Sequence, residues 1–144
     1  MAGADKLYTP ELLGLAVSLA DYPFDEGSPH RGSARSRSCG STLETSLSLD
    51  LESRIARVGL RVRACAVGQA SAALFAQGAM GQGEADLRAA HDALARWLAE
   101  GGETPDWPGL AALSEARGFP GRHGAIMLPW SAALDALSSP FPRS

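Results

Sequence analysis

The clearest pattern along the chain is an alternation of apolar and polar positions between residues 41 and 64. In its first half every second position can face a core: Leu43, Thr45, Leu47, Leu49 and Leu51. In its second half the corresponding positions are Val58, Leu60, Val62 and Ala64. Because successive side chains of a strand point to opposite faces, each half predicts a half-buried strand. The short polar link between them, residues 50–54, predicts an antiparallel hairpin.

The polar face of this hairpin carries a row of arginines. Arg57, Arg61 and Arg63 alternate with the apolar positions of the second strand. Such a row is typical either of a solvated sheet face or of a docking surface for a partner. The pattern favours the solvated face.

The segments before the hairpin predict a helix and then a loop. Thr9 and Pro10 are residue types that begin helices, and this helix should end before Pro23. Its predicted buried face is Leu12, Leu13, Ala16, Val17 and Ala20. Residues 22–38 are rich in Pro, Gly, Ser and Arg, which predicts a mobile surface loop.

The chain after Cys65 has helical patterns. A small-residue helix places Val67, Ala70, Leu74 and Gln77 on one face and ends near residues 79–83. A second helix begins around Glu84 and ends at Gly101, with a stripe of Leu87, Leu94, Trp97 and Leu98. His91 lies on that stripe, where a half-buried packing histidine is favoured over a ligand. Short helices are expected near 108–117 and 131–137.

These elements predict an α+β fold in one domain, residues 1–144. A small antiparallel sheet, the hairpin at about 41–64 with room for a further strand, carries helices on one face.

Composition narrows the function. The 144 residues are 45% hydrophobic and 20% charged, with a net charge of -3, which is ordinary for a globular domain. The acidic balance disfavours a general nucleic-acid binder. No apolar run approaches the ~20 residues that span a bilayer, and MAGADKLYTP lacks the order of a signal peptide. We therefore expect a cytoplasmic protein without a membrane or nucleic-acid partner.

Two cysteines carry the candidate chemistry. Cys39 stands just before the first strand and Cys65 just after the second, so an antiparallel hairpin brings both to one edge. In a reducing cytosol such a pair binds metal, is reactive or is merely buried. The start of a helix, where Cys65 lies, favours the thiolate form that binds soft metals. His123, in FPGRHGAI, is either a third ligand or a histidine of a surface loop.

Four segments resemble a known family. SCGST, the hairpin, RACAVGQASAALF and PGRHGAIMLPWSAAL occur in the order and spacing of the NifU/IscU-type iron–sulfur cluster assembly scaffold, especially its SufU-like branch. The resemblance extends from about residue 7 to 137, and LYTPELL resembles the opening helix of the family. The most specific block is the cysteine that ends a strand and is followed by GQASAA.

The resemblance implies a scaffold, not an enzyme, with no catalytic residues. Cys39 and Cys65 match the first and second scaffold cysteines, and with His123 they would hold a [2Fe–2S] cluster or iron, with zinc as another metal. A cysteine desulfurase would supply sulfur and recipient proteins would accept the cluster. The protein would be a monomer or a homodimer.

The chain departs from the family pattern at two positions. Ser41 stands where the family usually has Asp, and the third cysteine is absent: the aligned residue is Ala125 or, after a shift of one, Gly124. Tetrahedral metal sites and [2Fe–2S] clusters prefer four donors. Two other interpretations therefore remain open, a degenerate scaffold homologue acting as a non-catalytic interaction protein and a mononuclear Zn or Fe site that accepts sulfur.

Overall fold

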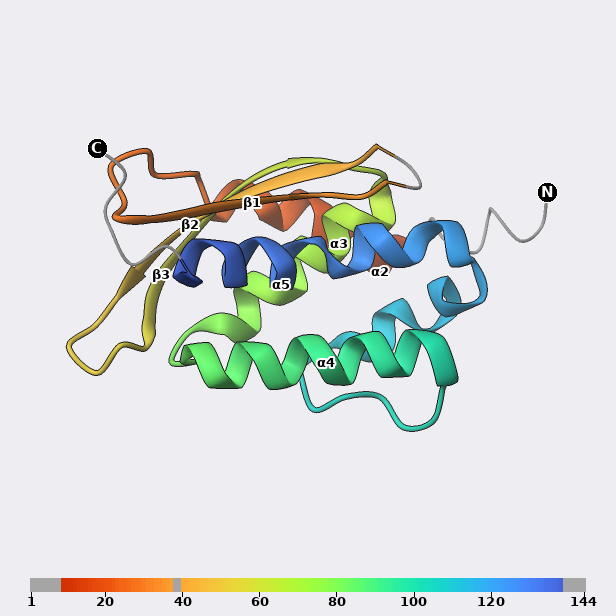
Figure 1. Ribbon diagram of the computed structural model, residues 1–144. Helices are drawn as coiled ribbons and strands as arrows, with labels where there is room; N and C mark the ends of the chain where they lie inside the picture. The colour runs from red at the N-terminus through yellow and green to blue at the C-terminus, as the bar shows by residue number, and fades with distance from the viewer. Residues whose placement is uncertain (1–8, 38–39, 139–144) are drawn as a thin grey trace.

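The computed structural model describes residues 9–37 and 40–138 (Figure 1). Its α-helices and strands in chain order are α2 (Pro10–Val17), β1 (His30–Arg35), β2 (Thr42–Leu49), β3 (Ile55–Arg63), α3 (Ala66–Ala79), α4 (Glu84–Glu100) and α5 (His123–Ser138). Short 3₁₀ helices span Ser18–Asp21, Leu110–Gly118 and Pro120–Arg122. Within the described residues, no helix has the length and apolar character needed to cross a membrane.

The sheet is antiparallel with the strand order β1-β2-β3. Figure 1 shows α3, α5 and α4 all on one side of it, with α5 lying along the sheet and α4 beyond α5. The predicted α+β fold, with helices on one sheet face, is therefore confirmed. We call the face that meets the helices the inner face and the opposite face the outer face.

The hairpin forms as its alternation predicts. Leu43, Thr45 and Leu47 of β2 are buried, and so are Val58 and Leu60 of β3. Leu51 is an exception, because β2 ends at Leu49 and Leu51 lies fully exposed in the turn. The alternation of the sequence continued past the point where the chain bends into that turn.

The predicted loop at residues 22–38 is wrong over His30–Arg35, which form β1. The inner positions of β1 include Gly32 and Ala34, opposite Thr45 and Leu43. These small side chains give no apolar alternation, so the strand has no hydrophobic signal. Gly32 is nevertheless required, because a Cβ there would lie 2.3 Å from the Ala132 oxygen and the Ala136 nitrogen of α5.

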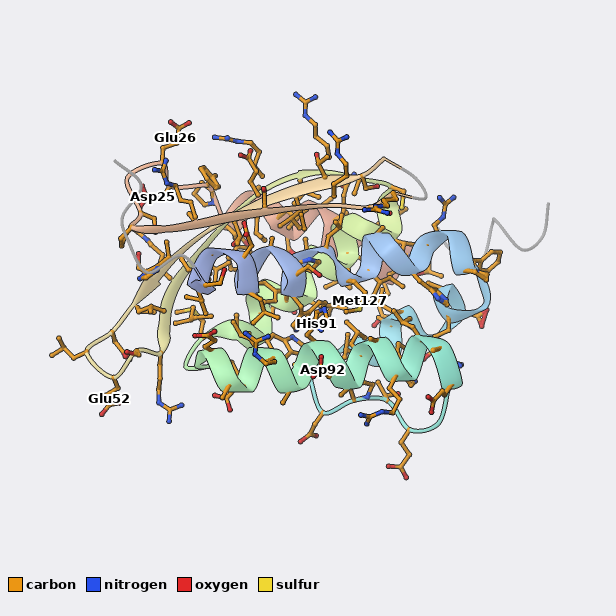
Figure 2. The ribbon with its side chains drawn as sticks, in the orientation of Figure 1. Asp25, Glu26, Glu52, His91, Asp92 and Met127 are labelled. Atoms are coloured by element: carbon orange, nitrogen blue, oxygen red, sulfur yellow. The ribbon has the colours of Figure 1, made fainter. Side chains whose placement is uncertain are left out.

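Residues 22–26, which we call the strap, cover part of the outer face. The Leu60 amide donates to the Tyr22 carbonyl oxygen (2.9 Å), and the Asp25 amide donates to Ser46 Oγ (2.9 Å). Gly59 makes this approach possible, since a Cβ there would lie 2.4 Å from the Pro23 carbonyl oxygen. Figure 2 shows Asp25 and Glu26 on the side of the sheet away from α4 and α5.

The N-cap of α2 is as the sequence predicts, whereas its buried face differs from the predicted one. Thr9 caps α2 by accepting from the Leu12 amide, as predicted. Of the predicted face of α2, however, Leu13 and Val17 are 45% and 75% exposed. This short helix buries only a narrow stripe against α3, so Leu15 and Leu19 pack on the core instead.

The later helices differ from prediction at single positions. The whole predicted stripe of α4 is buried, whereas Gln77 of α3 is exposed. Helix α5 begins at His123, eight residues before the predicted start, and contains Pro129. Proline is disfavoured inside helices, and here burial of α5 against the sheet and α3 overrides that preference. Phe75, Trp107 and Trp130 pack together in the core, one pair stacked and two edge-to-face, with ring centroids 5.2–5.7 Å apart.

Candidate functional site

Cys65 lies at the junction of β3 and α3, as the sequence predicts. It is the N-cap of α3, with an extended backbone (φ -66°, ψ 173°), and it makes no side-chain capping hydrogen bond. The thiol is free and half-buried. Its backbone is held on both sides, because the Gln69 amide donates to the Cys65 carbonyl oxygen (2.9 Å) and Gln69 Nε2 donates to the Ala64 carbonyl oxygen (2.8 Å). The helix start therefore fixes the position of the thiol without using its sulfur.

The hairpin register brings the start of β2 beside Cys65. Thr42 pairs with Arg63, two residues before Cys65. The chain before Thr42 bends tightly, with Gly40 in a left-handed conformation (φ +72°) and its amide donating to the Ser36 carbonyl oxygen (2.9 Å). Ser41, at the position of the family's usual Asp, is buried. Cys39 itself lies outside the described residues, so its placement at this edge stays a prediction.

His123 is the first residue of α5 and not part of a surface loop. Its Nε2 lies 2.7 Å from the Arg117 carbonyl oxygen. Since a carbonyl oxygen only accepts, Nε2 is the donor, and Nδ1 has a lone pair whenever the ring is neutral. Histidines that bind metals are commonly oriented by such a donated bond from the other ring nitrogen. The half-buried ring thus has one nitrogen fixed and the other available as a ligand.

The packing of α3 on α5 places both helix starts at one end of the molecule. A Cβ on Gly68 would lie 3.2 Å from the Ala125 Cβ, and Ser71 Oγ donates to the Ile126 carbonyl oxygen (2.6 Å). Figure 1 shows these helix starts toward the same end as the end of β1 and the start of β2. Cys65 and His123 therefore belong to the same end of the fold.

The described residues do not complete a metal site. Ala125, one of the positions aligned with the missing cysteine, is fully buried against Gly68 and provides no donor. Across residues 9–37 and 40–138, no three His, Cys, Asp or Glu side chains gather closely enough to hold a metal ion. Cys65 and His123 alone are too few for the four donors that tetrahedral sites prefer.

His91 behaves as the packing residue that the sequence favoured. It is half-buried on α4, and its Nδ1 lies 3.0 Å from Oδ1 of Asp92. In Figure 2 it lies on the side of α4 that faces α5. It is therefore a useful control for experiments on His123.

The sequence missed the ion network on the outer face. Arg61 contacts Glu44 (2.9 Å) and Glu26 (3.0 Å), and its guanidinium lies 4.3 Å from the Phe24 ring centre. These hydrogen bonds, first to Glu44 and then to Glu26, raise the pKa of Arg61 above its ordinary value. The alternation of the hairpin alone could have predicted that Glu44 lies beside Arg61 on the outer face. Glu26 and Phe24 contact Arg61 only because the strap lies over that face, which no sequence pattern indicates.

Comparison with known proteins agrees with this arrangement. The chain is similar to a crystal structure of a nitrogen-fixing NifU-like protein (N-terminal) from Brucella abortus, with 27% identity and a TM-score of 0.84 over 94% of this chain and 95% of that one. A putative iron–sulfur cluster assembly scaffold protein for the SUF system from Fervidobacterium islandicum AW-1 matches at 16% identity and a TM-score of 0.78, over 91% and 96%. This second match shows the fold alone. No family model and no curated protein matches the chain.

The chain, with Cys65 between a strand and a helix, thus has the fold of the NifU-like protein. The predicted resemblance to the NifU/IscU-type iron–sulfur cluster assembly scaffold family is confirmed.

Proposed function

We propose that this chain holds an iron–sulfur cluster, or the iron for one, as cargo and passes it to recipient proteins. The similarity to the NifU-like protein over nearly the whole of both chains carries the proposal. In this proposal residues 1–144 form one scaffold domain of the cytoplasm. The domain has no catalytic residues, and it works with a cysteine desulfurase as sulfur donor.

The proposed ligands are Cys39, Cys65 and His123. Thiolates and imidazole are donors that suit iron and zinc, and the hydrogen bond from His123 Nε2 to the Arg117 carbonyl oxygen leaves Nδ1 for a metal. A [2Fe–2S] cluster takes four ligands, so solvent or a second copy of the chain supplies the remainder. Incomplete protein ligation makes the cargo easy to release.

The test is anaerobic loading of the purified chain with ferric iron and sulfide. Bound iron, acid-labile sulfide and visible absorbance are measured after desalting. We expect wild type to retain iron and sulfide in equal amounts, Cys65→Ser to retain neither, and His123→Ala to lose its cargo faster than wild type. His91→Ala is the matched control and should behave as wild type does. Equal retention by Cys65→Ser and wild type would refute the proposal.

A mononuclear Zn or Fe site that accepts sulfur is the second candidate. It is favoured by the absence of the third cysteine, which leaves Ala125 or Gly124 at that position. Metal analysis of protein purified without chelators separates the two functions. Metal without sulfide, lost in Cys65→Ser, supports the mononuclear site. Protein that binds neither metal nor cluster under any of these conditions supports the third interpretation, an interaction protein that keeps only the fold.

A further inference from the structure

The outer face of the sheet is basic although the chain is acidic. The register places Arg35, Thr42 and Arg63 in one row across the three strands, and Ser33, Glu44 and Arg61 in the next. The third row begins with Arg31, opposite Ser46. The whole chain has a net charge of -3, so this concentration of arginine on one face is a local feature.

The arginines of this face fall into two groups. Arg57 and Arg61 are neutralised by acidic residues, Arg57 by Asp25 (3.7 Å) and Arg61 by Glu26 and Glu44. Within the described ranges 9–37 and 40–138, Arg31, Arg35 and Arg63 have no acidic partner within 4.0 Å. The strap supplies Asp25 and Glu26 at one end of the face only. Arg31 lies near the strap, in the same hollow as Glu26, whereas Arg35 and Arg63 carry uncompensated charge at the other end, toward Cys65.

The uncompensated arginines border two adjoining hollows. One, of about 350 Å³, is lined by residues that include Phe24, Arg31 and Asp135. The other, of about 410 Å³, is lined by residues that include Arg35, Thr42 and Arg63. Both hollows share Ser33, Glu44 and Arg61. Together they form a trough over the outer face that leads from the strap to the Cys65 edge.

We propose that this trough binds an extended acidic segment of a partner protein. Arg31 and Arg35 are four residues apart on one strand, about 13 Å. Arg35 and Arg63 stand two strands apart, about 10 Å. Carboxylates at positions i and i+4 of an extended segment repeat at the same ~13 Å, so they can meet Arg31 and Arg35 together. Guanidinium groups form paired, charge-assisted hydrogen bonds with carboxylates.

The acidic residues of the trough favour a peptide over a nucleic acid. Glu26, Glu44 and Asp135 also line it, and a continuous row of phosphates would be repelled where it passed them. Discrete carboxylates of a peptide can avoid these positions. The identity of the partner as a sulfur donor or cluster recipient rests on the proposed function, whereas the docking of an acidic segment does not.

The test uses a fluorescein-labelled peptide of about nine residues with Glu at every fourth position in a Ser background, long enough to span Arg31 to Arg35. Binding is followed by fluorescence anisotropy. The double variant Arg35→Gln/Arg63→Gln should raise Kd about tenfold and flatten its dependence on salt. The matched control is Arg88→Gln/Arg96→Gln on α4, which removes the same charge from a different surface. The control should change Kd less than twofold, as expected of distant charges under screening.

An equal loss of binding in both double variants would overturn the proposal, because only net charge would then matter. Absence of binding by wild type at low salt would also overturn it. Single-stranded DNA of equal charge is the competing ligand, and tighter binding of DNA than of peptide would assign the trough to nucleic acid instead. Iron and sulfide loading of Arg35→Gln/Arg63→Gln should equal that of wild type. If wild type fails to load iron and sulfide, the proposed function is refuted. The peptide titration then still tests the docking proposal independently.

Discussion

The two faces of the same sheet are built on different principles. The inner face meets α5 and α3 through close contacts, such as Gly32 against the backbone of Ala132 and Ala136. The outer face, among the described residues, carries no helix and is organised by charges, such as those of Arg61, Glu44 and Glu26. Steric fit therefore limits which side chains the inner face can hold, whereas charge determines which ligands the outer face can bind.

Within one strand, residues of the inner face therefore contribute to stability and residues of the outer face to ligand binding. Neighbouring residues of β1 point to opposite faces, so Gly32 belongs to the inner face and Ser33 to the outer one. A change at one should alter the free energy of unfolding, whereas a change at the next should leave it nearly unaltered. The comparison can therefore be tested one residue at a time.

Gly32→Ala should have the largest effect. The added Cβ would lie 2.3 Å from two backbone atoms of α5, and backbone cannot rotate away as a flexible side chain can. We expect a loss of about 3 kcal/mol in the free energy of unfolding, at the upper end for overpacking. Urea denaturation measures it. The control is Ser33→Ala, for which less than about 0.5 kcal/mol is expected of an exposed position. Similar losses in the two variants would contradict the division into faces.

Gly59→Ala should have the second largest effect, because the backbone of Gly59 is in tight contact with the strap on the outer face. Its Cβ would lie 2.3 Å from Ser46 Oγ and 2.4 Å from the Pro23 carbonyl oxygen. The strap can move away, so we expect about 1–2 kcal/mol and faster amide exchange at the strap. Gly14→Ala is the control, since nothing lies within 4 Å of its Cβ. On an exposed helix that change should be neutral or stabilising. Unchanged exchange at the strap in Gly59→Ala would show that the strap does not depend on this contact.

The parts of the fold that the sequence predicted are those with a strong local signal. The hairpin has a period-2 alternation, α4 has four buried stripe positions, and Thr9 with Pro10 marks a helix start. Cys65 was placed for the same reason, because it separates a strand pattern from a helix pattern. Each of these signals lies within one element and needs no knowledge of its neighbours.

The parts that were missed depend on a second element. Strand β1 has Gly32 on its inner face because α5 lies against it, and no pattern within the strand indicates this. The start of α5 at His123 depends on burial of a segment that contains Pro129. The strap contacts join Phe24 and Glu26 to Arg61 over a long sequence separation. The contact of His123 with the Arg117 carbonyl oxygen could not be predicted either, because it depends on α5 beginning at His123.

Arg61→Gln should have the smallest effect on stability, because the Arg61 side chain is 48% exposed and exposed ion pairs contribute little. The hydrogen bonds to Glu44 and Glu26 raise the pKa of Arg61. A raised pKa means that the stabilising charge is present below the ordinary arginine value and is lost only when pH rises through the higher folded value. The stability contributed by Arg61 should therefore not change with pH near neutrality, and salt concentration is the practical probe.

We expect the melting temperature of Arg61→Gln to fall by less than that of Gly59→Ala at low salt, and the difference from wild type to vanish in high salt. Arg96→Gln, an exposed change on α4 with no ion pair to lose among the described residues, should show neither effect. A deficit of Arg61→Gln that persisted unchanged in high salt would mean that its contact with the Phe24 ring, not its charges, holds the strap, and the outer face would then share the packing principle of the inner one.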